Sequence, residues 1–283
     1  MSVVGRYARP VGYGLIIAGL LFLAYLFVVV APQVQTFGHD AFAYWNVSLP
    51  DPYSIPWLDL GGFFYAPPVA LLFDWFDVVD WWVFSFLWLM LLVGSVIWMG
   101  WSPLWILAGL ALPPVALELY GGNIHILLAV AIVLGFSHPW TWSFVLLTKP
   151  SAGVGLLWFV VRREWRNLGI ALGSTAVLSV VAFVVMPSLW HDWITAIVDN
   201  LGTAAPANAV PVPLWLRLIL SALLVVWGAR TDRRWTVVVA AMLALPALWF
   251  GSFAMLIGVI PEIRRRSLVG RYDAMVSEEA TRP

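Results

Sequence analysis

The sequence predicts an all-α polytopic integral membrane protein, and three observations support this. Of the 283 residues, 62% are hydrophobic and only 11% are charged, whereas a soluble domain keeps roughly a quarter of its residues charged. Several apolar runs reach the roughly 18–20 residues that cross a hydrocarbon core as a helix. The basic residues gather in short clusters between these runs, as they do in the loops of multi-spanning proteins.

Eight apolar segments are candidates for membrane helices: 11–31, 81–100, 103–119, 124–137, 141–161, 167–186, 213–229 and 235–261. The first run is longer than the roughly 7–15-residue core of a secretory signal, so we expect an uncleaved span. We expect residues 1–283 to form a single transmembrane domain. Its non-spanning parts would be a first outer loop with a surface helix (32–80), a last long outer loop (187–212) and a cytoplasmic tail (262–283).

The basic clusters predict the orientation of the chain. Thirteen of the 15 basic residues lie near the two ends of the chain or in three short clusters. They are Arg6, Arg9, Arg271 and Arg282 and the arginines of "RREWR" (162–166), "ARTDRR" (229–234) and "EIRRR" (262–266). Positive charge marks the cytoplasmic side, so we expect both termini inside, in a multi-pass protein of the cell membrane. Segment 235–261 lies between two such clusters and must go out and return. Its centre, "LPALWFGS" (245–252), contains a Pro and a Gly for this reversal.

Two layouts satisfy the basic clusters. In the first, 141–161 consists of two half-helices that meet at Lys149–Pro150, because a residue before proline is pushed out of helical geometry. Broken helices of this kind line enclosed or watery cavities, and 66–80 would then lie along the outer surface. In the second layout 66–80 crosses the membrane and 141–161 is one span with Lys149 buried at its middle. We favour the first.

In the favoured layout, acidic residues gather outside. Nine of the 15 acids lie there: Asp40, Asp51, Asp59, Asp74, Asp77, Asp80, Glu118, Asp192 and Asp199. The cations at this face are Lys149 and Arg217. An outer mouth lined with acids and aromatic side chains around isolated cations has the form of an active site. The chain has no cysteine and shows no phosphate loop or HExxH motif, which argues against an ATPase or a zinc enzyme.

Asp40 is the candidate catalytic residue. It lies about nine residues past the first span, and Tyr44 follows at i+4, so a local helix would place both on one side. An aspartate at the membrane edge can act as a general base towards a sugar hydroxyl. The alternative is a solvated loop acid.

Lys149 and Arg217 are the candidate ligands for an anionic lipid headgroup. Cations within the membrane are costly and usually face a cavity or a partner. Arginine grips phosphate oxygens in a bidentate way, and lysine acts as a point charge. For Arg217 the alternative is snorkelling to the outer interface.

Further polar residues could contact a sugar or an acceptor. In "GGNIH" (121–125) these are Asn123 and His125, although Asn123 also suits a helix N-cap and His125 a buried core position. In "SLWHDWITAIVDN" (188–200), His191 or Asp192 could bond hydroxyl groups while the tryptophans stack on sugar faces. The alternative for the tryptophans is an aromatic belt on an interfacial helix.

Several short motifs occur in an order that resembles glycosyltransferase family 87, whose members are integral membrane mannosyltransferases of the GT-C fold class. These motifs are "HDAFAYW" (39–45), "PDPYS" (50–54), "FFYAPPVALL" (63–72), "YGGNIHILLA" (120–129) and "LLTKPSAGVGLLWFVVRREWR" (146–166). The resemblance covers roughly residues 10–262. The chain departs from the family in its shorter length and in "LPALWFGS", where the family shows Ser-Pro-x-x-Trp.

The resemblance implies a GT-C-like bundle of about eight to ten transmembrane helices, some short or broken. It implies inverting transfer of a sugar, with mannose expected, from a polyprenyl-phosphate donor to a lipid-linked or cell-envelope glycan. Asp40 would be the base and Lys149 would lie near the donor phosphate, with Arg217 as a second phosphate ligand. Sugar or acceptor contacts are expected from Tyr44, Tyr53, Tyr65, Asn123, His125, His191 and Asp192. No cofactor or nucleic acid is expected and no residue is assigned as a metal ligand, while the sequence leaves the metal requirement open.

Two other classes of function compete with this interpretation. A transporter or lipid flippase would place polar residues near the bilayer midplane, often between internal repeats, whereas here they gather at one face. A short relative without activity, acting in assembly, is the second alternative. The intact Asp40 and Lys149 argue against it.

Overall fold

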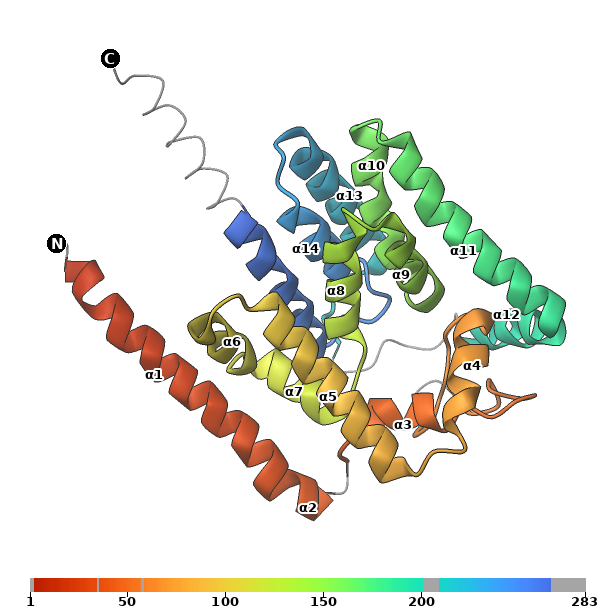
Figure 1. Ribbon diagram of the computed structural model, residues 1–283, viewed down its shortest axis with the longest axis horizontal. Coiled ribbons are helices and arrows are strands. Elements are labelled where there is room, and N and C mark those ends of the chain that lie inside the picture. Colours follow the sequence, from red (N-terminus) through yellow and green to blue (C-terminus); the bar gives the residue numbers. More distant parts are fainter. Residues whose placement is uncertain (1–2, 35, 57–58, 201–208, 266–283) are drawn as a thin grey trace.

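The computed structural model describes residues 3–34, 36–56, 59–200 and 209–265, and in this part of the chain every regular element is helical (Figure 1). The chain begins with α1 (Val3–Tyr25), which continues through a π-helical stretch (Leu26–Val30) into α2 (Ala31–Val34). Figure 1 shows this rod along one flank of the molecule.

The segment after the rod folds into short helices only. These are α3 (His39–Trp45), α4 (Pro67–Phe73) and a 3₁₀ turn (Asp74–Phe76). Two prolines start α4, where their missing N–H groups cost nothing. At 1.5 Å per residue, α4 is about 10 Å long and too short to cross a bilayer. The layout in which 66–80 is a full crossing is therefore not the one found.

The next four helices are α5 (Trp81–Met99), α6 (Pro103–Leu110), α7 (Pro113–Gly121) and α8 (His125–Gly135). Asp80 caps α5, because its carboxylate accepts the backbone N–H of Trp82 at 2.9 Å and so satisfies a free donor of the first turn. The axes of α6 and α7 are bent by 70° at the short break between them.

Segment 141–161 is broken as predicted. A 3₁₀ turn (Pro139–Thr141) leads into α9 (Trp142–Thr148), and a 3₁₀ stretch (Pro150–Leu156) leads into α10 (Leu157–Val161). Lys149 stands between them at φ −136° and ψ 76°, outside helical geometry. The proline at 150 accounts for this, because its ring disfavours a helical conformation in the preceding residue.

The last part of the fold contains α11 (Trp165–Val185), α12 (Ser188–Asn200), α13 (Leu214–Arg230), α14 (Trp235–Leu243) and a 3₁₀ stretch (Gly251–Gly258). The chain between α14 and the final stretch is not helical, which confirms the predicted break at "LPALWFGS". The predictions for Arg271 and Arg282, and for parts of the 187–212 loop and the 262–283 tail, lie outside the described residues.

Three helical stretches are long and apolar enough to cross a membrane: Pro10–Val34, Trp81–Met99 and Trp165–Val185. The bent pair of α6 and α7 would be a fourth. The fold class of an all-α polytopic membrane protein is thus confirmed. The remaining apolar segments are short or broken, so the expected count of eight to ten crossings stays a prediction.

The core forms around α8. Its side chains are apolar on nearly every side, and Ile126, Leu128 and Ile132 are fully buried, as expected for a central helix. It packs against α5, α9, α14 and the 3₁₀ stretch 251–258. In contrast, the apolar windows of α1 and α11 are each only 11% buried, and Figure 1 shows these helices at opposite flanks. Their exposed faces suit contact with lipid.

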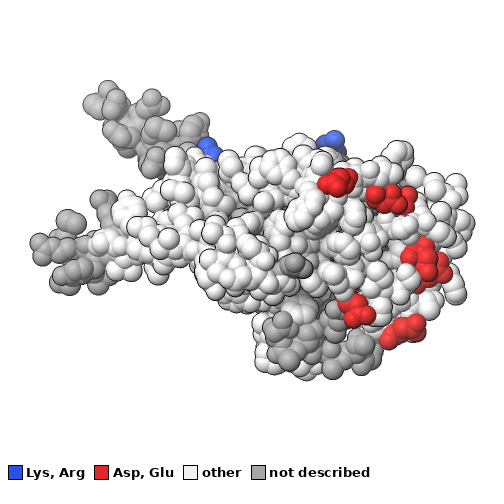
Figure 2. Space-filling view, turned by 90° about the horizontal axis from the view of Figure 1, so that it is seen from below, with Lys and Arg blue, Asp and Glu red and all other residues white. Residues whose placement is uncertain are grey.

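Charge is separated between two ends of the molecule. Seen from below, exposed acids gather on the half of the surface that lies away from the chain ends, and the basic side chains in view lie at its upper rim (Figure 2). The "RREWR" and "ARTDRR" turns contact each other. Arg162 of the first turn forms ion pairs with Glu164 of its own turn and with Asp232 of the second. Arg265 pairs with the same Asp232. These contacts join the clusters that the sequence places on one side of the membrane.

Candidate active site

Two segments far apart in the sequence lie side by side and form one wall of the site. Tyr120 pairs with the segment before α3, because its carbonyl accepts the Gly38 N–H at 2.9 Å. Next along the wall, a Cβ added at Gly121 would lie 3.1 Å from Oδ2 of Asp40. The chain continues with Gly122 against Ala41 and Asn123 against Tyr44. The chain 120–123 therefore lies along 38–44, and the order of the contacts follows the sequence in both segments.

The two glycines make this approach possible. A Cβ at Gly122 would meet the Cβ of Ala41 at 2.6 Å, and the φ of +74° lies in the left-handed region, which glycine adopts without strain. Gly121 leaves room for the Asp40 carboxylate. The "GGN" motif thus brings α3 into contact with the turn between α7 and α8.

A line of tyrosines leads from α3 to Lys149. The Tyr44 and Tyr65 hydroxyls lie 3.0 Å apart, and their rings stack at 5.7 Å. The Tyr53 hydroxyl donates to the Tyr65 carbonyl at 2.9 Å. Nζ of Lys149 lies over the Tyr65 ring, 5.2 Å from its centre, within range of a cation–π contact. The Ala66 N–H donates to the Leu147 carbonyl and ties this loop to α9.

Burial keeps these phenols neutral. It raises the pKa of Tyr44 and of Tyr65 well above the usual value, and the charge of Asp40 adds to the shift for both. Burial also raises the pKa of Tyr53, with Asp192 contributing. At neutral pH the three hydroxyls therefore stay protonated and serve as neutral hydrogen-bonding groups.

Asp40 lies in the first turn of α3, and its side chain is 43% exposed. Nδ1 of His39 lies 3.8 Å from Oδ1 of Asp40. The hydrogen-bonding contact with Asp40 raises the pKa of His39, and partial burial opposes this. The charges of Asp40 and Glu118 both act on the Lys149 ammonium. An acid open to solvent and a cation at a helix break thus share one electrostatic environment.

The structure joins Glu118, His125 and Ser252 into a buried chain of polar groups, a connection that the sequence did not predict. Glu118 accepts the backbone N–H of His125 at 2.6 Å, and its Oε2 lies 3.2 Å from Nδ1 of His125. Nε2 of His125 lies 3.4 Å from the Ser252 hydroxyl, which accepts the Trp249 N–H at 3.2 Å. Glu118, His125 and Ser252 are all less than 6% exposed. The chain connects α7, α8 and the last 3₁₀ stretch behind the site.

This chain changes the role expected for His125. Both ring nitrogens face protein partners, so the geometry is that of a side chain that holds the α7–α8 turn rather than one that contacts a sugar. Asn123 is partly engaged as well, since its Oδ1 accepts the Ile124 N–H at 2.7 Å and faces the Tyr44 hydroxyl at 3.4 Å. The signal for Glu118 was an acid inside an apolar run, which is usually functional or paired.

The guanidinium of Arg217, a predicted ligand of the donor phosphate, is engaged in hydrogen bonds within the protein. The side chain is 5% exposed, and its guanidinium donates to four backbone carbonyls: those of Val212, Leu243, Leu245 and Pro246. These carbonyls belong to the segment before α13, to the last residue of α14 and to the non-helical turn that follows α14. The contacts describe a structural side chain, and phosphate binding by Arg217 stays a prediction that they do not support.

His191 and Asp192 lie on α12, at the edge of the same loop. His191 is exposed, and Asp192 is half-buried and acts electrostatically on Tyr53. Trp193 docks α12 on the loop, because its Nε1–H donates to the Phe64 carbonyl at 3.1 Å. Asp192 is therefore near the tyrosine line, whereas His191 points to the surface.

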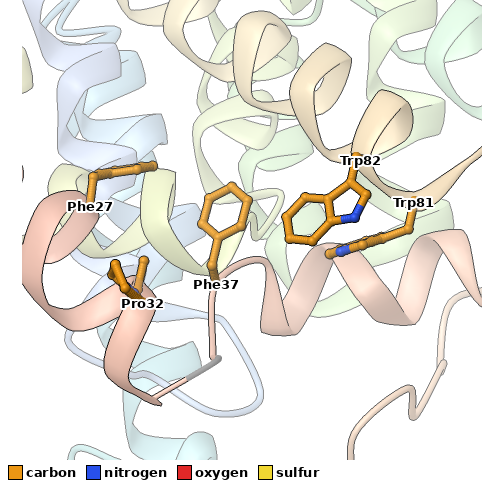
Figure 3. A pocket seen from close by; sticks show the side chains of 6 residues that line it. Phe27, Pro32, Phe37, Trp81 and Trp82 are labelled. Carbon is orange, nitrogen blue, oxygen red and sulfur yellow. The ribbon is translucent and has the colours of Figure 1, made fainter.

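An apolar groove adjoins the Asp40 end of the site (Figure 3). It has a volume of about 630 Å³ and is lined by Phe27, Ala31, Pro32, Phe37, Trp81 and Trp82. Figure 3 shows Phe37 between the end of the α1–α2 rod and the two tryptophans that begin α5. Both helices are candidate spans, so the groove opens between two walls that face lipid.

The comparison with protein families agrees with this arrangement. The description of glycosyltransferase family 87 matches residues 63–260, a stretch that contains Tyr65, Glu118, Asn123 and Lys149, whereas Asp40 precedes it. No curated protein and no solved structure matches the chain. Since the match covers well over half of the residues, the chain belongs to glycosyltransferase family 87 and is a membrane glycosyltransferase.

Proposed function

We propose that this protein transfers a sugar from a polyprenyl-phosphate donor to a lipid-linked or cell-envelope glycan at the outer face of the cell membrane. Mannose is the sugar that the family resemblance favours. The transfer would invert the configuration at the anomeric carbon, with Asp40 as the general base and Lys149 at the donor phosphate.

The observation that carries this proposal is the continuous line from Asp40 through Tyr44 and Tyr65 to Lys149. Proton acceptance requires a carboxylate that substrate can reach, and Asp40 is partly exposed. Phosphate binding requires a cation, and Lys149 stands at a helix break with its ammonium over a tyrosine ring. The reaction needs both groups in one site.

The chemistry balances without a further reactant. The acceptor hydroxyl oxygen forms a bond to the anomeric carbon while its proton passes to the Asp40 carboxylate. The bond between that carbon and the phosphate oxygen breaks, and the electron pair leaves with polyprenyl phosphate. The Lys149 ammonium would stabilise the charge that develops on the leaving oxygen, which is the kind of interaction that contributes most to catalysis.

The remaining residues would position the reactants. Neutral Tyr44 and Tyr65 present hydroxyl groups to the sugar between the base and the cation, and Tyr53 and Asp192 would border the site from the outer loop. Asn123 would complete the wall beside Tyr44. Glu118 and His125 would hold the turn that carries this wall.

The test is sugar transfer from radiolabelled polyprenyl-phosphate mannose to membrane glycolipids by the purified protein, compared with Asp40→Asn. Loss of a general base costs about a hundredfold or more in kcat, and we expect that loss with donor binding retained. Asp51→Asn is the matched control, because Asp51 is an exposed acid of the same loop, and it should keep wild-type activity.

Other outcomes would contradict the proposal at different points. Full activity in Asp40→Asn would show that Asp40 is not the general base, although the protein would still be a glycosyltransferase. No transfer by the wild type from any polyprenyl-linked sugar, together with uptake of a solute by proteoliposomes, would favour the transporter interpretation.

A further inference from the structure

The turn between α10 and α11 carries an arginine where glycine is usual. Arg163 follows α10 at φ +58°. Its N–H donates to the Val160 carbonyl at 3.1 Å, and the Glu164 N–H donates to the Phe159 carbonyl at 2.8 Å, which is the Schellman pattern of a helix end. A left-handed residue with a side chain is less stable there than glycine. The backbone therefore does not favour arginine at this position.

The contacts that hold this turn in place do not involve the Arg163 side chain. Arg162 pairs with Glu164 at 2.9 Å and with Asp232 at 3.1 Å. The Glu164 carboxylate also accepts from Nδ2 of Asn167 at 2.9 Å. In the part of the chain that the structure describes, the exposed guanidinium of Arg163 has no acceptor and no aromatic partner. Its charge is therefore available to a partner from outside the protein.

Arg166, three residues further on in the first turn of α11, shares these properties. It is exposed, and no acceptor for it occurs among the described residues. Between the two arginines Trp165 is 60% exposed and begins a helix that is long and apolar enough to cross a membrane. Tryptophan at the end of a span lies at the level of the lipid headgroups. The turn thus presents two unpaired positive charges at that level.

We propose that Arg163, Trp165 and Arg166 form a binding site for the headgroup of an anionic phospholipid of the surrounding membrane. Charge complementarity favours this partner, because guanidinium groups pair with phosphate oxygens in a bidentate way and basic segments beside a span attract anionic lipids. A zwitterionic lipid has the same phosphate but no net charge, so it binds less tightly. This site is separate from the site of sugar transfer and goes beyond the proposed function.

The test is native mass spectrometry of the purified protein in detergent, titrated with phosphatidylglycerol or with phosphatidylcholine of the same acyl chains. An arginine near an anionic surface contributes about fivefold to affinity. We therefore expect the first phosphatidylglycerol to bind to the wild type about 30-fold more tightly than phosphatidylcholine. Arg163→Gln and Arg166→Gln should each weaken phosphatidylglycerol binding by about fivefold, and the double variant should lose the preference. Equal affinity of the wild type for both lipids would overturn the proposal.

Arg264→Gln is the matched control for the loss of one positive charge. Arg264 is an exposed arginine that lies over the Trp101 ring at 6.0 Å. Its neighbour Arg265 pairs with Asp232, so it belongs to the same end of the molecule as the α10–α11 turn. The control should keep the wild-type affinity for phosphatidylglycerol. An equal loss in Arg264→Gln would show a response to positive charge in general, and the assigned site would then be wrong.

Arg163→Gly separates lipid binding from a structural role of the side chain. Glycine relieves the left-handed geometry, so the melting temperature in detergent without added lipid should be unchanged or higher by about 2 °C. The increase caused by phosphatidylglycerol should nevertheless be smaller than in the wild type. A lower melting temperature without lipid would identify Arg163 as a structural side chain and contradict the proposal. An equal increase with inorganic phosphate would indicate a site for free anions instead of lipid.

Discussion

Individual residues around Asp40 show how a sequence pattern leads to a candidate site. The spacing of Asp40 and Tyr44 predicted a shared side of a short helix, and both residues contact the same glycine-rich turn. His39 was not a candidate, yet its imidazole lies 3.8 Å from the Asp40 carboxylate. The raised pKa of His39 means that its proton is held to a higher pH than in a free histidine.

His39→Gln should change the dependence of kcat on pH. Protonated His39 stabilises the Asp40 carboxylate and makes it a weaker base, so wild-type kcat should rise as the pH increases through the pKa of His39, above 6.5. The effect on stability has the opposite sign, because the raised pKa of His39 stabilises the fold at low pH and this contribution is lost as the pH rises. Since His39 is half exposed, we expect a change of only a few-fold.

The measurement is kcat between about pH 5.5 and 8.5 for the wild type, His39→Gln and a control, His138→Gln. His138 is an exposed histidine outside the site, so its variant should keep the wild-type profile. A profile in His39→Gln identical to that of the wild type would show that His39 does not act on the base.

At the scale of elements, two helix breaks carry the architecture. The break at Lys149 places a cation at the end of the tyrosine line, and the break after α14 brings Ser252 to His125. Both breaks contain a proline in the sequence and both were predicted. The Arg217 guanidinium stabilises the break after α14 by donating to three of its carbonyls, and this interaction was not predicted.

Arg217→Met should destabilise the protein without weakening donor binding. The variant leaves buried carbonyls of Leu243, Leu245 and Pro246 without their donor, at a cost of about 3 kcal/mol or more. For a chain of this length we expect the melting temperature to fall by about 5–10 °C. The measurement is thermal unfolding in detergent together with the KM for the donor at a temperature where the variant is folded.

Arg230→Gln is the control for this experiment, because Arg230 is exposed at the end of the same helix, and it should leave both quantities unchanged. If Arg217→Met kept its melting temperature and raised the KM for the donor strongly, Arg217 would be a phosphate ligand after all.

At the scale of the whole molecule, the separation of acids from basic clusters implies opposite sides of a membrane. Tyr65 contacts Lys149 in the part that we expect outside, and Arg162 pairs with Asp232 in the part that we expect inside. The chain contains no cysteine, so single cysteines report on this arrangement without background.

We expect Ser54→Cys to react with a membrane-impermeant maleimide on intact cells, and Thr231→Cys to react only after the membrane is opened. Both positions are exposed, and the second lies in a basic turn that should face the cytoplasm. Mass-shift labelling on a gel measures both reactions. Reaction of both variants from the same side would overturn the proposed orientation of the site.

Much of the fold follows from the sequence alone. The low fraction of charged residues and the long apolar runs determine an all-helical membrane protein, because only structures with internally satisfied backbone groups cross lipid. The prolines at 150 and 246 determine where two segments break, because proline removes a donor and restricts its neighbour. The order of short motifs that begins with "HDAFAYW" and runs to "LLTKPSAGVGLLWFVVRREWR" predicted the family, and the match over residues 63–260 confirms it.

Only the tertiary structure decided which polar side chains meet. Glu118 and Ser252 are distant in sequence and join through His125, and Arg217 turns to carbonyls 26 to 29 residues away. Local spacing carries no information about such contacts, because a buried polar group takes whichever partner the packing of other helices brings within reach. The sequence determined the membrane class, the helix breaks and the family, and packing decided which polar residues line the site and which ones hold it in place.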